Sequence, residues 1–373
     1  MLVKKLLIMV AVAVTLCGCC SKNSYNLVML GDIHYDRTDL HDHNVYKNFN
    51  PDVPFAQGVL NKEGLFSWRS QTLWVIKNRG EDLRTVPKNV KMWKKNLPML
   101  LDNAAAAARK NNALYLFQLG DMVQGDAGTY KLHKEMLAGG LNSMTSRFSC
   151  PVLNVLGNHD TRGPGGTQAW QDIVIAHYDK TVKNIKRKNS NFYFKLQGDI
   201  YYFHDLLNPD MAFLEEAVNT PSRYFFFVSH VPVVPAEESW IRNILSDDTE
   251  RILELLLKRD AIVLSGHTHT MAISRYQPVK YKNTITQFVL NSTLRTPAKQ
   301  KNFTPQVIFS SNPSKINAKG RELWKKLFAG KIDVSLLTHG SGYAVLRVSD
   351  DGVFVDFHNI GKAPVTFTLK KVK

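Results

Sequence analysis

The chain has 373 residues, of which 44% are hydrophobic, so it can bury one large core or two smaller ones. This composition excludes an intrinsically disordered protein. The formal net charge of +16 favours anionic ligands such as phosphates, nucleic acid or acidic lipid surfaces, but solvated surface lysines can account for much of it and the charge names no partner.

The first residues have the pattern of a secretory signal. Two lysines precede an apolar stretch from Leu6 to Leu16, which is too short to span a bilayer and fits a signal-peptide core. The segment LCGC, ending at Cys19, resembles the lipobox of bacterial lipoproteins. We therefore expect residues 1–18 to be removed, Cys19 to be lipidated, and the protein to be anchored in the bacterial cell envelope, on its periplasmic side or at the cell surface. Because a cysteine occupies the second lipobox position, cleavage before Cys20 stays open.

Past this signal the chain alternates between apolar runs and helical patterns. A helix is expected over residues 92–110, where apolar positions recur at helical spacing. Short, continuous apolar runs of this kind are typical of central strands covered on both faces. They occupy residues 25–31, 113–120, 151–157, 223–230 and 261–266.

The remaining strand patterns indicate a second sheet. Residues 284–293, 343–349 and 352–358 read as added strands, with an Asp-Asp-Gly turn between the last two. Residues of about 36–90 and 298–335 show no clear periodicity, so we expect them to be inserts that border the functional site. The predicted organisation is thus one domain over residues 19–373 carrying two inserts.

Five of the apolar runs end in polar side chains of the kind that bind metals. Because open α/β sheets place their sites at the carboxyl ends of strands, these side chains are expected to meet. Carboxylate and imidazole ligands suit divalent Zn, Mn or Fe, and there are too many groups for one ion. Glycine before each block lets the backbone turn sharply near the ions. The blocks are GDIH (31–34), GDMVQGD (120–126), GNHD (157–160), His230 and GHTH (266–269).

In this order the blocks resemble the calcineurin-like metallophosphoesterases over residues of about 25–295. The resemblance implies an α/β fold, a four-layer α/β/β/α sandwich of two mixed β-sheets with the metal site at the strand carboxyl ends. It implies that Asp121 bridges two divalent ions, most consistent with Mn, Fe or Zn. The first ion would bind Asp32, His34 and His269, and the second would bind Asn158, His230 and His267.

The same resemblance assigns the rest of GNHD to catalysis. His159 would face the substrate phosphate, and Asp160 would orient the imidazole by a hydrogen bond. The expected reaction is hydrolysis of a phosphomonoester or a phosphodiester by metal-activated water. The alternative is a non-catalytic binding or scaffold protein on the same fold, which the complete ligand set disfavours.

A few polar residues stay outside this assignment. Arg162 and Arg295 could contact a substrate phosphate, although a surface salt bridge is at least as good an interpretation. His41 and His43 lie in a polar stretch and are expected to be solvated. The expected partners are a phosphate ester and, through the lipid anchor, a membrane. No specific nucleic acid partner is predicted.

Overall fold

A computed structural model describes residues 23–41, 94–125, 127–163, 165–236, 248–293, 318–359 and 362–372. The predicted signal peptide, Cys19, Cys20, His43 and Arg295 lie outside these ranges. So do residues 42–93 and 294–317, which hold most of the two expected inserts. None of the helices within the described ranges has the length and apolar character needed to cross a membrane.

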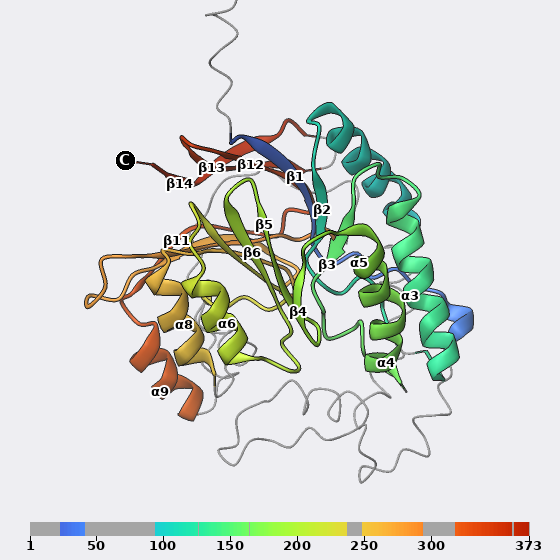
Figure 1. Cartoon of the computed structure of the whole chain (residues 1–373), viewed down its shortest axis with the longest axis horizontal. Helices are drawn as coiled ribbons and strands as arrows, with labels where there is room; N and C mark the ends of the chain where they lie inside the picture. Colours follow the sequence, from blue (N-terminus) through green and yellow to red (C-terminus); the bar gives the residue numbers. More distant parts are fainter. Residues whose placement is uncertain are drawn as a thin grey trace, which may run out of the picture.

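Two mixed β-sheets form the centre of the molecule, with helices on their outer faces (Figure 1), as predicted. The six-stranded sheet has the order β14 (Val365–Lys371), β13 (Gly352–Asn359), β12 (Gly342–Ser349), β1 (Tyr25–Leu30), β2 (Tyr115–Gln118), β3 (Val152–Asn154). Strands β1, β2 and β3 run parallel, and β12 pairs antiparallel with β1.

The eight-stranded sheet has four parallel strands at its middle and antiparallel strands at both edges. Its order is β11 (Ile332–Thr338), β9 (Met271–Tyr276), β10 (Ile285–Val289), β8 (Ile262–Ser265), β7 (Phe225–Ser229), β6 (Asp199–His204), β5 (Asn191–Leu196), β4 (Lys186–Lys188).

The helices cover the two outer faces of this pair of sheets (Figure 1). The predicted helix is present over residues 94–110. It belongs to the side of the six-stranded sheet, together with α3 (Tyr130–Thr145), α4 (Gly166–Trp170), a π-helical turn (Gln171–Ile175) and α5 (Ala176–Thr181). The eight-stranded sheet is covered by α6 (Met211–Asn219), α8 (Thr249–Lys258) and α9 (Ala318–Leu327).

Strand β7 illustrates why a continuous apolar run suits this layered arrangement. Successive side chains of a strand point to opposite faces. Phe226 and Val228 belong to the core that includes the six-stranded sheet, whereas Phe225 and Phe227 pack with α6 and α8. All four side chains are buried, so the run has no polar face and lacks the alternation of a half-exposed strand.

The second expected insert needs a correction. Residues 318–335, assigned to an irregular segment, contain α9 and the first part of β11, which pairs with β9 at the edge of the eight-stranded sheet. Among the side chains of residues 322–327 that the structure describes in α9, Leu327 is buried, and Leu323 and Trp324 pack partly buried against the same core. These few apolar positions stand among lysines, so the segment gave no readable apolar pattern.

An ion pair between the partly exposed Arg223 and the buried Asp199 joins the two sheets at the amino ends of their strands. The guanidinium of Arg223 donates to both carboxylate oxygens of Asp199, at 3.0 and 2.6 Å, and the Tyr25 hydroxyl donates to the same carboxylate at 2.8 Å. Arg223 also donates to the Asn23 carbonyl and pairs with Asp350. This network therefore fixes the point at which the chain enters β1.

We expect Asp199→Ala to lower the free energy of unfolding by about 1–3 kcal/mol, because buried donors such as the Tyr224 N–H would lose their acceptor. Arg223 would keep its pair with Asp350. Asp199 is fully buried, whereas the Asp350 side chain is half-exposed. The matched control Asp350→Ala should therefore cost less than about 1 kcal/mol. Chemical denaturation of both variants measures the difference, and equal losses would contradict a structural role for the Asp199 carboxylate.

Candidate metal centre

The predicted ligands converge where the strands of the two sheets end. Strands β1, β2 and β3 bring in one set of blocks, and β7 and β8 bring in the other. The carboxylates and imidazoles form two groups, within each of which the candidate ligand atoms lie within 4.8 Å of one another. The first group is Asp32, His34, Asp121 and His269, and the second is Asp121, His230 and His267.

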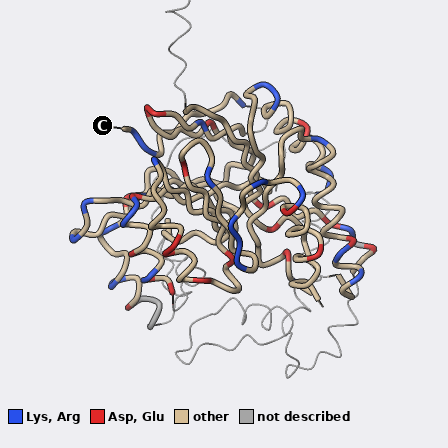
Figure 2. Tube along the Cα trace, viewed as in Figure 1, with Lys and Arg blue, Asp and Glu red and all other residues tan. Residues whose placement is uncertain are grey.

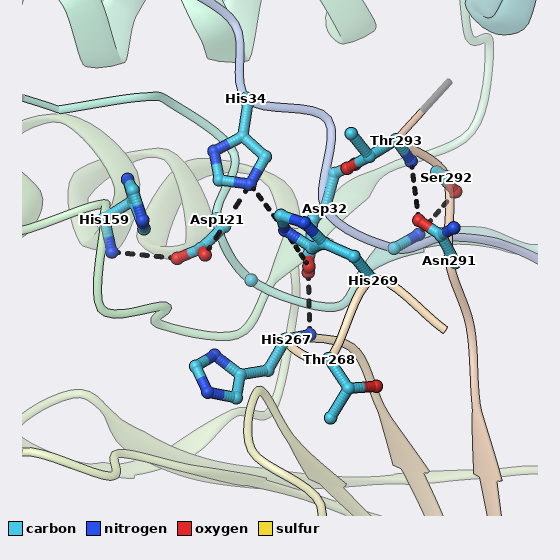
Figure 3. A network of polar contacts seen from close by, with 12 residues as sticks. Asp32, His34, Asp121, His159, His267, Thr268, His269, Asn291, Ser292 and Thr293 are labelled. Atoms are coloured by element: carbon cyan, nitrogen blue, oxygen red, sulfur yellow. Dashed lines mark hydrogen bonds and ion pairs between the residues drawn. The ribbon is translucent and has the colours of Figure 1, made fainter. Parts of the chain in front are cut away.

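The first group is held together by direct contacts between its polar atoms (Figure 3). His34 Nε2 lies 3.0 Å from His269 Nε2 and 3.9 Å from Asp121 Oδ2. His269 Nε2 is also 3.1 Å from Asp32 Oδ2. The other oxygen of Asp32 accepts a hydrogen bond from the backbone N–H of His267, at 2.9 Å. Asp32 therefore links the first group to the loop that carries the second.

The second group is centred on His230. Its Nε2 lies 3.2 Å from Asp121 Oδ2, 3.1 Å from Asn158 Oδ1 and 3.2 Å from His267 Nδ1. Its Nδ1 donates to the Leu119 carbonyl at 2.8 Å, which leaves Nε2 as the atom available to a metal. The amide oxygen of Asn158 thus lies beside the second group, where the resemblance to the family placed it.

The backbone of this site is strained. Four of the predicted ligands adopt positive φ angles in the left-handed region, which side chains other than glycine rarely occupy. They are His34 (44°), Asp121 (52°), His267 (71°) and His269 (52°). Gly120 has a φ of 90°, and a Cβ there would lie 2.2 Å from His230 Nδ1. Gly120 therefore provides the sharp turn that the sequence analysis expected, and its lack of a side chain leaves room for the His230 ring.

Burial and charge set the protonation of the site. Burial lowers the pKa of His34 and of His267 well below the usual value, so both imidazoles are neutral, as metal ligands must be. Burial opposes ionisation of Asp121, but the imidazoles of His230 and His159 outweigh it and hold the pKa of this carboxyl well below its usual range.

His230 differs from the other imidazoles. Burial alone would lower its pKa, but the charges of Asp121 and Asp32 raise that pKa to about 9. In the absence of metal both ring nitrogens are therefore protonated and the ring is positively charged. A bound metal ion would displace the proton on Nε2.

The donor set fits two divalent cations. Buried carboxylates and ring nitrogens face one another at hydrogen-bond distance, with no thiolate among them, and this is the ligand chemistry of Zn, Mn and Fe. Because Asp121 belongs to both groups, its carboxylate is placed to bridge two ions, as carboxylates do in two-metal hydrolases.

His159 lies beside the first group, and its backbone N–H donates to Asp121 Oδ1 at 2.8 Å. Its ring packs edge-on against His34, with centroids 4.8 Å apart. Nδ1 of His159 bonds the Gln124 carbonyl at 2.8 Å, and Nε2 lies 3.4 Å from an Arg162 guanidinium nitrogen. Arg162 is only 9% exposed, so its side chain lies within the site rather than at the open surface.

The structure gives the Asp160 carboxylate other partners than the resemblance implied. Its carboxylate accepts the backbone N–H groups of Val123, at 3.0 Å, and Gly157, at 2.8 Å, and makes no hydrogen bond to the His159 ring. The Gln124 carbonyl orients that ring instead. Burial and the charge of Asp121 raise the pKa of Asp160 to about 7. Asp160 therefore joins the loop after β2 to the loop after β3 and does not set the tautomer of His159.

The prediction of a solvated His41 is wrong. The sequence suggested a solvated histidine, but its side chain is only 4% exposed and its Nε2 lies 2.7 Å from Asp36 Oδ1. A backbone bridge between His41 and Ala127 holds this segment against the loop after β2. A polar stretch became buried here because a long-range pairing covered it, which local composition does not reveal.

A further set of polar residues, missed from the sequence, supports Asp32 (Figure 3). The Thr293 hydroxyl donates to the Asp32 carbonyl at 2.9 Å, and the Ser292 hydroxyl accepts the Gly31 N–H at 2.8 Å. Asn291 in turn accepts the Thr293 N–H at 3.0 Å. These residues follow the apolar strand β10, so the rule that identified the other blocks would also have found them.

We expect Thr293→Val to weaken metal binding at the first group by about 10- to 100-fold, because hydrogen bonds to a ligand residue hold that ligand in place. The second group should keep its affinity. Metal titration of the metal-depleted protein measures both, with Thr181→Val, an exposed helical position, as the isosteric control. Equal weakening of both groups would show that Thr293 supports the fold rather than Asp32.

The chain resembles known proteins both in sequence and in fold. The family model described as calcineurin-like phosphoesterase matches residues 25–271. A dimetal phosphatase from Danio rerio has a similar fold, with a TM-score of 0.50 and 11% identity over 93% of this chain and 99% of that chain. A purple acid phosphatase from yellow lupin gives a TM-score of 0.49 and 12% identity over 92% of this chain and 53% of its own.

No curated protein sequence matches the chain. The family match covers well over half of the residues and contains all five predicted blocks. The chain therefore belongs to the calcineurin-like phosphoesterase family and is a metal-dependent phosphoesterase.

Proposed function

We propose that the protein hydrolyses phosphomonoesters or phosphodiesters in the bacterial cell envelope, using two divalent ions of Mn, Fe or Zn. The observation that carries this proposal is the convergence of the predicted ligands into two groups that share Asp121. The first ion would be held by Asp32, His34, His269 and Asp121, and the second by Asn158, His230, His267 and Asp121.

Different residues of the chain have different roles in hydrolysis. When bound, the two ions would supply an activated water and neutralise charge on the phosphoryl oxygens. His159 and Arg162 lie together beside the first group. Arg162 can donate to a phosphoryl group placed there, and His159 can donate from Nε2 when its imidazole is protonated. The Gln124 carbonyl accepts from Nδ1 of His159 and thereby directs Nε2 toward the substrate.

The envelope location is supported by the N-terminal sequence alone. The charge, length and cysteine pattern of the first 19 residues suit a lipoprotein signal. Mass analysis of the mature N-terminus would identify a lipid on Cys19, or on Cys20 if cleavage falls one residue later. An unmodified N-terminus would contradict the anchor and leave the catalytic proposal untouched.

The decisive experiment for the catalytic proposal joins metal analysis to a substrate panel. Protein purified without chelator should hold two equivalents of metal per chain and hydrolyse p-nitrophenyl phosphate or its bis ester. The ratio of the two rates distinguishes a monoesterase from a diesterase. One equivalent of metal would contradict the dinuclear site, and two equivalents with no activity on any ester would contradict the proposed reaction.

A further inference from the structure

The side of the molecule opposite the metal centre, here called the amino-end face, contains the amino ends of the parallel strands. The chain enters β1 on this face, where Arg223 bonds the carbonyl of Asn23. Bonds from Asn283 to the Leu257 carbonyl, and from Thr284 to Asp260, tie the loop between β9 and β10 to the end of α8. Lys370 of β14 bonds the Asp260 carbonyl at 2.9 Å, so both sheets contribute to one continuous face.

Exposed apolar side chains gather on the amino-end face. The described residues include five large hydrophobic side chains that are exposed, and three of them lie here. Val279, at 99% exposure, is in the loop between β9 and β10. Val372, at 55%, follows β14, and Leu114, at 38%, precedes β2. Single exposed apolar residues are ordinary. Here three of them lie on one face, each just beyond the end of a strand, and we call these three side chains the apolar tips.

Basic residues surround these tips. Lys280 and Lys282 lie in the same loop as Val279, and Figure 2 shows basic residues along that loop. The buried or half-buried acidic residues Asp199 and Asp260 of this face are paired with Arg223 and Lys370. The turn between β12 and β13 adds the exposed Asp350, which also pairs with Arg223, and Asp351. Lys280 lies 3.9 Å from Glu254. The exposed basic residues at this end of the strands and of the helices that precede them are Arg109, Lys110, Lys195, Lys258, Lys280, Lys282 and Lys371.

The predicted anchor would hold this face near a membrane. Asn23 follows Cys19 by four positions, and four extended residues span at most about 14 Å. The metal centre lies beyond the far end of β1, whose six residues extend about 20 Å. A lipid on Cys19 thus places the amino-end face close to the bilayer and the metal centre away from it.

We propose that the amino-end face docks on an anionic lipid bilayer, with Val279, Val372 and Leu114 reaching the headgroup region and the surrounding lysines above it. Each basic residue near such a surface contributes about 1 kcal/mol of attraction. The metal centre then faces the aqueous compartment. This proposal rests on the proposed function and narrows it to water-soluble phosphate esters, excluding the headgroups of the anchoring bilayer.

The test places a tryptophan on each side of the molecule. Val279→Trp lies on the amino-end face. Met99→Trp is the matched control, because Met99 is 40% exposed and lies in the first half of the helix over residues 94–110, away from that face. The full-length protein is bound to vesicles of phosphatidylcholine and phosphatidylglycerol that contain nitroxide-labelled lipid. We expect the added tryptophan of the Val279 variant to be quenched several-fold more than that of the Met99 variant.

Charge variants test the role of the lysines. Lys280→Glu with Lys282→Glu should reduce the quenching at position 279 several-fold, and replacing phosphatidylglycerol by phosphatidylcholine should do the same. Lys131→Glu, at the start of α3 on the other side, should leave it unchanged. Equal quenching at positions 279 and 99, or none at 279, would overturn the docking. If the tryptophan introduced at position 279 is shielded from solvent in the lipid-free protein, this face binds a protein partner instead. That result would also overturn the proposed docking on lipid.

The restriction to water-soluble esters is tested separately. The vesicle-bound enzyme should hydrolyse a soluble ester as fast as the protein in detergent and should release no phosphate or headgroup from its own vesicles. Headgroup release would overturn the restriction to soluble esters. Docking without hydrolysis of any ester would count against the proposed function and leave the docking face standing.

Discussion

Asp121→Ala is expected to remove both metal ions and to lower kcat/KM by on the order of 10³-fold or more. The physical reason is that Asp121 belongs to both ligand groups, so its loss leaves each ion one carboxylate short. The ions supply several kcal/mol of transition-state stabilisation, which corresponds to this range. Elemental analysis of the purified variant gives the stoichiometry, and initial rates on p-nitrophenyl phosphate give the activity.

Single-group variants provide the matched comparison. His34→Ala should chiefly weaken the first ion, and His267→Ala should chiefly weaken the second, because each imidazole belongs to one group only. Circular dichroism should confirm that the three variants fold. If Asp121→Ala kept one full equivalent while His34→Ala lost both, the bridging role would belong to another residue.

His159→Asn is expected to keep both metal ions and the fold while losing about 10²- to 10⁴-fold in turnover. His159 contacts Asp121 through its backbone N–H, which asparagine retains, and its ring is held by the Gln124 carbonyl. The substitution therefore removes the imidazole without removing a ligand. Metal analysis and steady-state kinetics on the same preparation separate the two effects.

The leaving group reveals what the imidazole does. If His159 protonates the departing alkoxide, the loss should be smaller for p-nitrophenolate than for an alkyl alcohol, since a weakly basic leaving group needs little protonation. The same loss for both esters would assign His159 to charge stabilisation instead. Retained activity, or metal loss together with activity, would show that the role assigned to this imidazole is wrong.

The layered fold was accessible from the sequence because the central strands are covered on both faces. Continuous runs such as residues 223–230 have no polar alternation and are easy to recognise. Strands at the edges of the sheets were harder to recognise from the sequence. Strand β4 consists of Lys186, Arg187 and Lys188, all exposed, and exists because it pairs with β5. Local composition carries no sign of such a pairing.

The candidate site shows the same division between local and distant effects. The ligand positions followed from where each strand ends, which is a property of short segments. The orientation of His159 did not, because Gln124 acts through its backbone carbonyl and any residue there could provide one. The identity of a side chain predicts what it can bind, but only the folded chain decides that Asp160 bonds Val123 and Gly157.

The pairing of β1 with β12 has a consequence for how the protein matures. Strand β1, which leads into Asp32 and His34, has β2 on one side and β12 on the other, with Tyr25 opposite Val348. Strand β2 lies within the first third of the chain, whereas β12 spans residues 342–349, so almost the whole polypeptide must be synthesised before this sheet can close. Pairings of such long range form slowly, and their exposed edges invite aggregation in the meantime. The strand that leads into Asp32 and His34 therefore gains its second neighbour only after residues 342–349 have been synthesised.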